Sequence, residues 1–130
     1  RVVVSDPKIY YVNGCNFLDI ELRQGGPEEF LTLIKNSTFF VTSSFHGVIF
    51  GAMFDARMLV LRYSCSTFDD DRIETLLNQL CLEERYIASS DLTPERLQQT
   101  QQVSVVKQLE KLRDSGLTYL KRQLKLFRLL

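Results

Sequence analysis

The residues best suited to chemistry lie in one short stretch, "TSSFHG", at positions 42–47. It contains His46, the single histidine of the chain, preceded by Ser43 and Ser44 and followed by Gly47. The charge of a histidine changes near neutral pH, so this side chain can hold an anion or deliver a proton. The serine hydroxyls can donate hydrogen bonds, and a glycine lets a ligand approach the backbone closely. The stretch therefore predicts a small anion-binding site.

The hydrophobic pattern places this stretch between a strand and a helix. Residues 38–42, "TFFVT", have the composition of a buried strand, and apolar residues recur with helical spacing over residues 45–54. Ligands of parallel α/β sheets bind where strands end and helices begin, and the start of a helix attracts anions. A second interpretation stays open, in which Ser44 only caps the helix and His46 hydrogen-bonds a neighbouring loop.

The rest of the chain continues this alternation of short strands and helices. Further strands are expected at residues 8–12 and 57–61, and further helices at 27–36 and 69–80, after which "CLEERYI" returns to the core. The pattern predicts an α/β fold, with a Rossmann-like parallel sheet and flanking helices. We expect a single α/β domain over residues 1–130.

Two helices carry further expectations. The helix at 45–54 is apolar on nearly every face, so we expect it to be buried nearly all round. Thr93-Pro94-Glu95 starts a C-terminal helical region, residues 94–130, which Gly116 is expected to break in two.

Composition excludes several classes of protein. The chain has 130 residues with 16 basic and 16 acidic side chains, whereas a general nucleic-acid binder normally has an excess of bases. No apolar run is long enough to span a membrane, and the opening "RVVVSDPKIYY" is too short and polar for a secretory signal. We expect a cytoplasmic protein that binds no nucleic acid.

The cysteines do not form a disulfide framework or a zinc site. The chain has three cysteines and no CxxC motif: Cys15, Cys65 and Cys81. With a single histidine, a zinc site made of cysteine and histidine would need an unusual set of ligands. We expect reduced, mostly buried thiols and no metal.

Two longer stretches resemble a known family. "EEFLTLIKNSTFFVTSSFHGVIFGAMFDARMLVL" and the following "DDDRIETLLNQLCLEERY" are similar to the C-terminal part of the polysaccharide pyruvyl transferases, over roughly residues 27–86. The shared features are a helix ending in L-I-x-N, the "TSSFHG" junction, R-I-x-x-L-L, and L-x-x-R just beyond. These bacterial enzymes have a two-domain fold like that of GT-B glycosyltransferases. The resemblance implies that this chain is the C-terminal domain of a longer enzyme.

The resemblance also implies a reaction. Family members transfer the pyruvyl group of phosphoenolpyruvate to sugar hydroxyls and so form a ketal in a cell-surface polysaccharide. The substrates implied are phosphoenolpyruvate and a sugar or polysaccharide acceptor, with no other cofactor. His46 matches a histidine associated with phosphoenolpyruvate recognition, and Arg72 matches the arginine of R-I-x-x-L-L. Without its N-terminal domain the chain is expected to bind ligand but not to catalyse.

Arg72 has an alternative role. It follows Asp69, Asp70 and Asp71, which can neutralise it by pairing within the first turn of the helix. The three aspartates are more typical of a helix cap than of a metal site.

Two other functions stay open. The same architecture fits half of a nucleotide-sugar glycosyltransferase, or a non-catalytic α/β domain that binds a phosphorylated metabolite. The sequence has no Walker A loop, GxGxxG or GxSxG, which disfavours P-loop enzymes, dinucleotide enzymes and serine hydrolases.

The C-terminal region is basic and amphipathic. Leu120, Leu124 and Phe127 lie among cationic residues, so this helix either packs on protein or rests on the inner face of an anionic membrane. The cations are Lys121, Arg122, Lys125 and Arg128.

Overall fold

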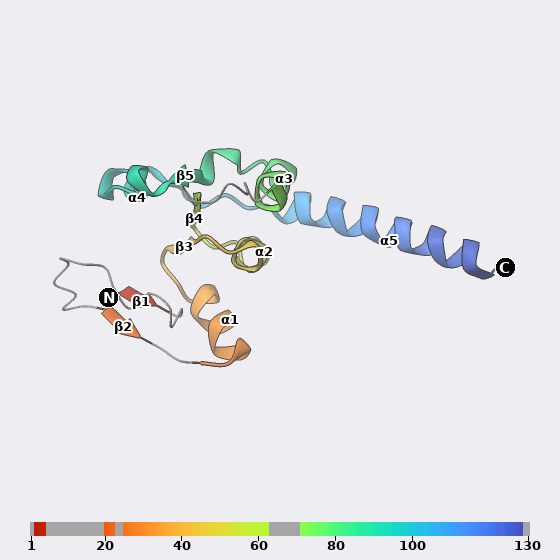
Figure 1. Ribbon diagram of the computed structural model, residues 1–130, viewed down its shortest axis with the longest axis horizontal. Coiled ribbons are helices and arrows are strands. Elements are labelled where there is room, and N and C mark those ends of the chain that lie inside the picture. Colours follow the sequence, from red (N-terminus) through yellow and green to blue (C-terminus); the bar gives the residue numbers. More distant parts are fainter. Residues whose placement is uncertain (1, 5–19, 23–24, 63–70, 129–130) are drawn as a thin grey trace. The chain divides into compact units, whose positions relative to one another are not determined.

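A computed structural model describes residues 2–4, 20–22, 25–62 and 71–128. The chain divides into two compact units, Arg1–Asn36 and Ser37–Leu130 (Figure 1). The α/β class and the Rossmann-like parallel arrangement predicted from the sequence are confirmed in the second unit. The strand expected at residues 8–12, Cys15 and Cys65 lie outside the described residues.

The first unit contains a pair of parallel strands and one helix. Strands β1 (Val2–Val4) and β2 (Ile20–Leu22) pair with each other, and helix α1 follows at Pro27–Lys35. Pro27 opens α1, which has acidic residues in its first turn and a lysine in its last, so its charges complement the helix dipole. The predicted helix is confirmed, and Asn36 forms its C-terminal cap.

The second unit is built on three parallel strands. Strands β3 (Phe40–Thr42), β4 (Met58–Arg62) and β5 (Tyr86–Ala88) lie in the order β3-β4-β5. The strands predicted at residues 38–42 and 57–61 are confirmed as β3 and β4, with boundaries shifted by one or two residues. The burial expected of the first strand is wrong, because β3 is an edge strand of this sheet and Val41 is 37% exposed. Because all three strands run in the same direction, their C-terminal ends meet at one edge of the sheet.

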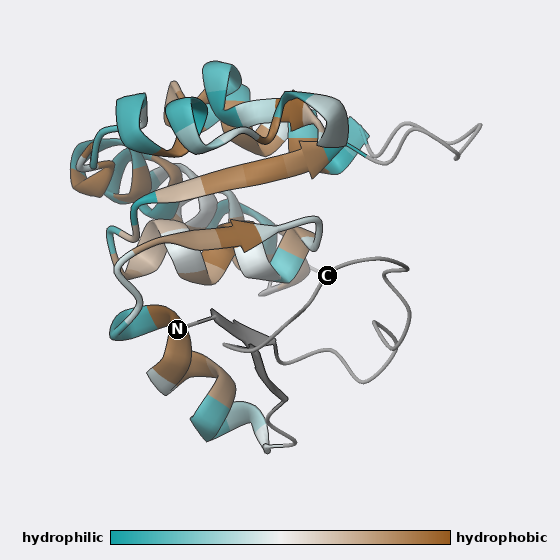
Figure 2. Cartoon of the chain, turned by 90° about the vertical axis from the view of Figure 1, so that its left-hand side faces the viewer, coloured by the Kyte–Doolittle hydropathy of each residue, from teal (hydrophilic) through white to brown (hydrophobic). Residues whose placement is uncertain are grey.

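Helices after the first two strands complete the core. Helix α2 (Phe45–Met53) joins β3 to β4, and helix α3 (Asp71–Leu80) precedes β5. The strands carry hydrophobic residues along most of their length, and hydrophilic residues lie on the outer parts of the helices (Figure 2). The buried cluster draws on α2, β4, α3, the residue Leu82 just after α3, and the segment before the last helix: Val48, Ala52, Met58, Val60, Ile73, Leu77, Leu80, Leu82 and Val105.

Helix α2 is buried on one face only, which corrects the prediction of burial nearly all round. Its buried residues are Gly47, Val48, Gly51 and Ala52, whereas Met53 is 60% exposed. The reason is size, because the small residues let α2 lie close to the sheet. A Cβ on Gly51 would come within 2.6 Å of the Met58 sulfur.

The C-terminal region forms two helices instead of one interrupted helix. Thr93 caps α4 (Pro94–Gln99) as its sequence predicts, and α5 then runs without a break over Val106–Arg128. The break expected at Gly116 is therefore wrong. A glycine inside a helix costs only about 1 kcal/mol relative to alanine, which a long helix tolerates.

Two short 3₁₀ turns flank β5, at Glu83–Arg85 and Ser89–Asp91. Before the first of them, Cys81 ends α3 with a left-handed backbone, φ 58°, and is exposed. The prediction of a buried thiol is wrong for Cys81, because its neighbours Leu80 and Leu82 occupy the core and Cys81 lies on the exposed side between them.

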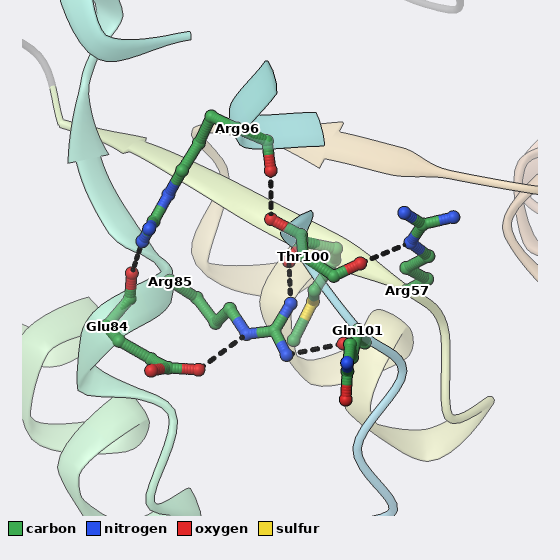
Figure 3. Close-up of polar contacts among 7 residues, drawn as sticks. Arg57, Glu84, Arg85, Arg96, Thr100 and Gln101 are labelled. Carbon is green, nitrogen blue, oxygen red and sulfur yellow. Dashed lines mark hydrogen bonds and ion pairs between the residues drawn. The ribbon is translucent and has the colours of Figure 1, made fainter. Parts of the chain in front are cut away.

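Arg57 ties the end of α4 to the start of β4 (Figure 3). Its Nε donates a hydrogen bond to the Thr100 carbonyl, and Nη2 donates to the carbonyls of Leu97 at 2.7 Å and Gln98 at 3.1 Å. The last carbonyls of a helix have no partner within it, so one guanidinium satisfies several of them. The same guanidinium lies over the ring of Phe39, 5.1 Å from its centroid.

Asp55, which lies far from α5 in the sequence, holds the start of this helix in place. Its carboxylate accepts hydrogen bonds from the Val105 amide at 3.2 Å and the Ser104 hydroxyl at 3.1 Å, and its carbonyl accepts one from Gln102. A carboxylate in this place caps the helix and complements its dipole. Asp55 and Arg57 together hold the C-terminal helices against the sheet.

Candidate functional site

The predicted junction lies at the C-terminal edge of the sheet. Thr42 ends β3, and Ser44 is the N-cap of α2, its hydroxyl oxygen accepting a hydrogen bond from the Gly47 amide at 3.4 Å. The Ser44 amide donates to the Thr42 hydroxyl at 3.1 Å. The amides of Phe45 and His46, in the first turn, have no acceptor within the helix and are available to an anion.

Gly47 has a packing role in this turn. It is buried, and a Cβ added to it would lie 2.3 Å from the Thr42 hydroxyl oxygen and 3.1 Å from the Thr42 Cβ. The Thr42 side chain, whose hydroxyl accepts a hydrogen bond from the Ser44 amide, therefore fills the space that a larger residue at position 47 would need. The glycine brings the helix start close to the strand end.

Replacement of Gly47 by alanine is expected to destabilise the fold by about 1–2 kcal/mol, since the overpacking outweighs the better helix propensity of alanine. Chemical denaturation measures the change. Gly116→Ala is the matched control, because nothing lies within 4 Å of a Cβ there, and it should be neutral or stabilising. In a Thr42→Ala background the penalty of Gly47→Ala should shrink, and an unchanged penalty would contradict the assigned contact.

His46 is exposed and lies beside an aromatic ring. Its imidazole meets the Phe45 ring in an edge-to-face arrangement, with centroids 5.8 Å apart at 81°. Arg72, in the first turn of α3, places its guanidinium carbon 5.4 Å from the centroid of the same ring. The structure thus brings the two predicted basic residues to one aromatic side chain, although 26 positions separate them in the sequence.

Arg62 is a further basic residue at this edge that the sequence analysis missed. It ends the central strand β4, is exposed, and lies over the ring of Tyr86 in β5, 4.5 Å from its centroid. The available signal was a basic residue directly after an apolar strand, "MLVLR". Arg62 adds positive charge at the C-terminal end of the strand next to β3.

Comparison with known proteins gives a partial family match. The model of the polysaccharide pyruvyl transferase family matches residues 3–64. The match covers just under half of the chain, and this segment is similar to that family. Neither the curated proteins nor the solved structures gave a significant match to the chain.

The segment that resembles the pyruvyl transferases contains most of the candidate site. Ser43, Ser44, His46 and Gly47 lie within it, as does Arg62. It begins well before residue 27, where the resemblance was expected to start, and it ends before Arg72. The position of Arg72 beside Phe45 therefore depends on the structure and not on the family match.

The arginine of L-x-x-R does not lie at this edge. Arg85 precedes β5 and is buried, and it donates hydrogen bonds to the carbonyls of Met58, at the start of β4, and Gln101 (Figure 3). Its Nε forms an ion pair with Glu84 at 3.5 Å. Burial lowers the pKa of Arg85, Glu84 acts in the opposite direction, and two nearby arginines lower it further. Arg85 is a structural residue at the opposite end of the strands from His46.

The acidic run before α3 is only partly described. Asp71 opens the helix and is exposed, whereas Asp69 and Asp70 lie outside the described residues. Within residues 25–62 and 71–128, no group of three histidine, cysteine or acidic side chains could hold a metal ion.

Proposed function

We propose that this chain forms the phosphoenolpyruvate site of a polysaccharide pyruvyl transferase, which transfers the pyruvyl group to sugar hydroxyls of a cell-surface polysaccharide. The observation that carries the proposal is the family match over residues 3–64, which includes His46 at the C-terminal edge of a parallel sheet. An N-terminal domain, as the two-domain resemblance implies, would supply the second wall of the site and hold the acceptor.

The chemistry of the edge suits this donor. Phosphoenolpyruvate carries a phosphate and a carboxylate. At the edge of the sheet, the exposed basic side chains of His46 and Arg72 both lie against the Phe45 ring, and Arg62 ends β4. The first amides of α2 add hydrogen-bond donors and a positive helix end. Ser44 uses only an acceptor lone pair as a cap, so its O–H can still donate to the ligand.

The reaction needs a proton at the donor methylene and two hydroxyl groups of the sugar. In the proposed sequence, protonation of C3 turns the methylene into a methyl group, the first sugar hydroxyl bonds to C2, and the second replaces phosphate there. The two sugar hydroxyl groups lose two protons in total. One proton is gained at C3, and the other leaves with phosphate. No oxidant or reductant takes part.

His46 is best suited to hold the anionic donor in this sequence. It lies in the first turn of α2, where the helix end and nearby arginine favour an anion over a neutral group. Delivery of the proton to C3 is its alternative role, and the two roles differ in whether a variant loses binding or only turnover.

The test is a titration of the chain with phosphoenolpyruvate, followed by NMR signals of the one histidine ring. The expected result is a saturable shift of the His46 signals with phosphoenolpyruvate, larger and tighter than with inorganic phosphate. UDP-sugar is the second control, because a glycosyltransferase half would favour it.

The outcomes separate the candidates. A preference for UDP-sugar would replace the proposal with a glycosyltransferase, and equal responses to phosphate and phosphoenolpyruvate would reduce the site to a general anion binder. The absence of any shift would contradict the presence of a donor site in this chain.

A further inference from the structure

Helix α5 has two different halves. Leu109 and Leu112, in its first half, pack against the core cluster of the second unit. Beyond them the helix extends away from the rest of this unit (Figure 1), and its large apolar side chains are exposed. Leu120 is 56% exposed, Leu124 64% and Phe127 71%. We call residues 117–128 the distal segment.

The large apolar residues of the distal segment gather mainly on one face, whereas Leu126, which is 52% exposed, lies on the far side of the helix near Arg122. Leu117, Leu120, Leu124 and Phe127 recur at three- and four-residue steps and so make one stripe. After Asp114 every charged residue is basic: Lys121, Arg122, Lys125 and Arg128. Lys121 and Lys125 flank the stripe, and Arg122 lies on the opposite side of the helix. The segment therefore combines exposed apolar area with an unbroken set of positive charges.

We propose that the distal segment binds an anionic phospholipid surface, lying in the plane of the membrane with its apolar stripe among the headgroups. An amphipathic helix with leucine and phenylalanine on one face and lysine and arginine on the other is suited to that position. None of the helices in the described residues is long and apolar enough to cross a membrane. This inference goes beyond the donor chemistry and does not rest on it.

Charge favours lipid over a second copy of the chain. Two distal segments packed along their stripes would bring together four cations from each copy with no acid among them. Like charges on neighbouring helices repel, whereas each lysine near an anionic leaflet contributes favourably.

The test measures cosedimentation of the full chain with phosphatidylcholine vesicles, with and without phosphatidylglycerol. We expect binding only to the anionic vesicles, and weaker binding when salt shortens the Debye length from roughly 30 to 8 Å. Lys121→Gln with Lys125→Gln should weaken it about 25-fold, from about fivefold per lysine. Lys107→Gln with Lys111→Gln is the matched control, because this pair has the same spacing on the core-bound half of α5; it should bind nearly as the parent does.

A fluorescent variant gives an independent readout. The chain has no tryptophan, so Phe127→Trp places a single reporter on the stripe. Its emission should shift to the blue on anionic vesicles, and Leu120→Gln with Leu124→Gln should abolish binding. Binding to neutral vesicles alone, no vesicle binding, or a dimer that needs Leu120 and Leu124 would each overturn the proposal.

Discussion

Replacement of His46 by glutamine is expected to weaken phosphoenolpyruvate binding by about 10- to 100-fold. Glutamine keeps a polar side chain of similar size but loses the imidazole N–H groups that would bind the anion, and a hydrogen bond to a charged group is worth about 1.5–3 kcal/mol. His46 is exposed on α2, away from the buried cluster, so the fold should be unchanged. Isothermal titration calorimetry with the full chain measures the affinity.

Two further variants make this result specific. Lys107→Gln removes one positive charge from α5 and should leave the affinity nearly unchanged, which controls for net charge. Phe45→Leu keeps an apolar residue but removes the ring that both His46 and Arg72 contact, and should give an intermediate loss. If His46→Gln bound the donor as tightly as the parent chain, the assignment of His46 to anion binding would be wrong.

Replacement of Arg57 by methionine is expected to lower the free energy of unfolding by about 3 kcal/mol. The variant loses charge-assisted hydrogen bonds to three carbonyls around the end of α4, and those carbonyls are left without that donor. Methionine fills much of the same volume, so loss of packing contributes less. Denaturant unfolding with linear extrapolation measures the change.

The matched control is Arg113→Met on the exposed part of α5, which should change stability by less than about 0.5 kcal/mol. Arg57→Lys should fall between them, because one ammonium can satisfy fewer of these carbonyls than a guanidinium does. Equal stabilities of Arg57→Met and Arg113→Met would show that the α4 segment is held by other contacts.

Local sequence signals predicted most elements, because they act within a few residues. Pro27 and Thr93 mark helix starts, and Ser44 supplies the cap of α2 as its position before the apolar run indicates. The predictions that were wrong concern single residues, whose observed conformation costs too little free energy to change the fold. Gly116 is a weak breaker that a continuous α5 tolerates, and Cys81 adopts the left-handed conformation at the end of α3.

Burial was harder to predict than secondary structure. The sequence of α2 is apolar on most faces, yet the sheet accepts only the face carrying Gly47, Val48, Gly51 and Ala52. Which face that is depends on the strands beside it, and hydrophobicity alone does not distinguish a residue against the sheet from one on the outer face.

The sequence by itself determined the strand–helix junction, its single histidine and the relation to pyruvyl transferases, since these reside in contiguous residues. The tertiary structure alone decided which distant residues share that edge. Arg72 reaches Phe45, Arg62 reaches Tyr86, and Arg85 instead serves the opposite end of the strands. Those pairings follow from the order and register of β3, β4 and β5, which join segments far apart in the chain and leave no local pattern in it.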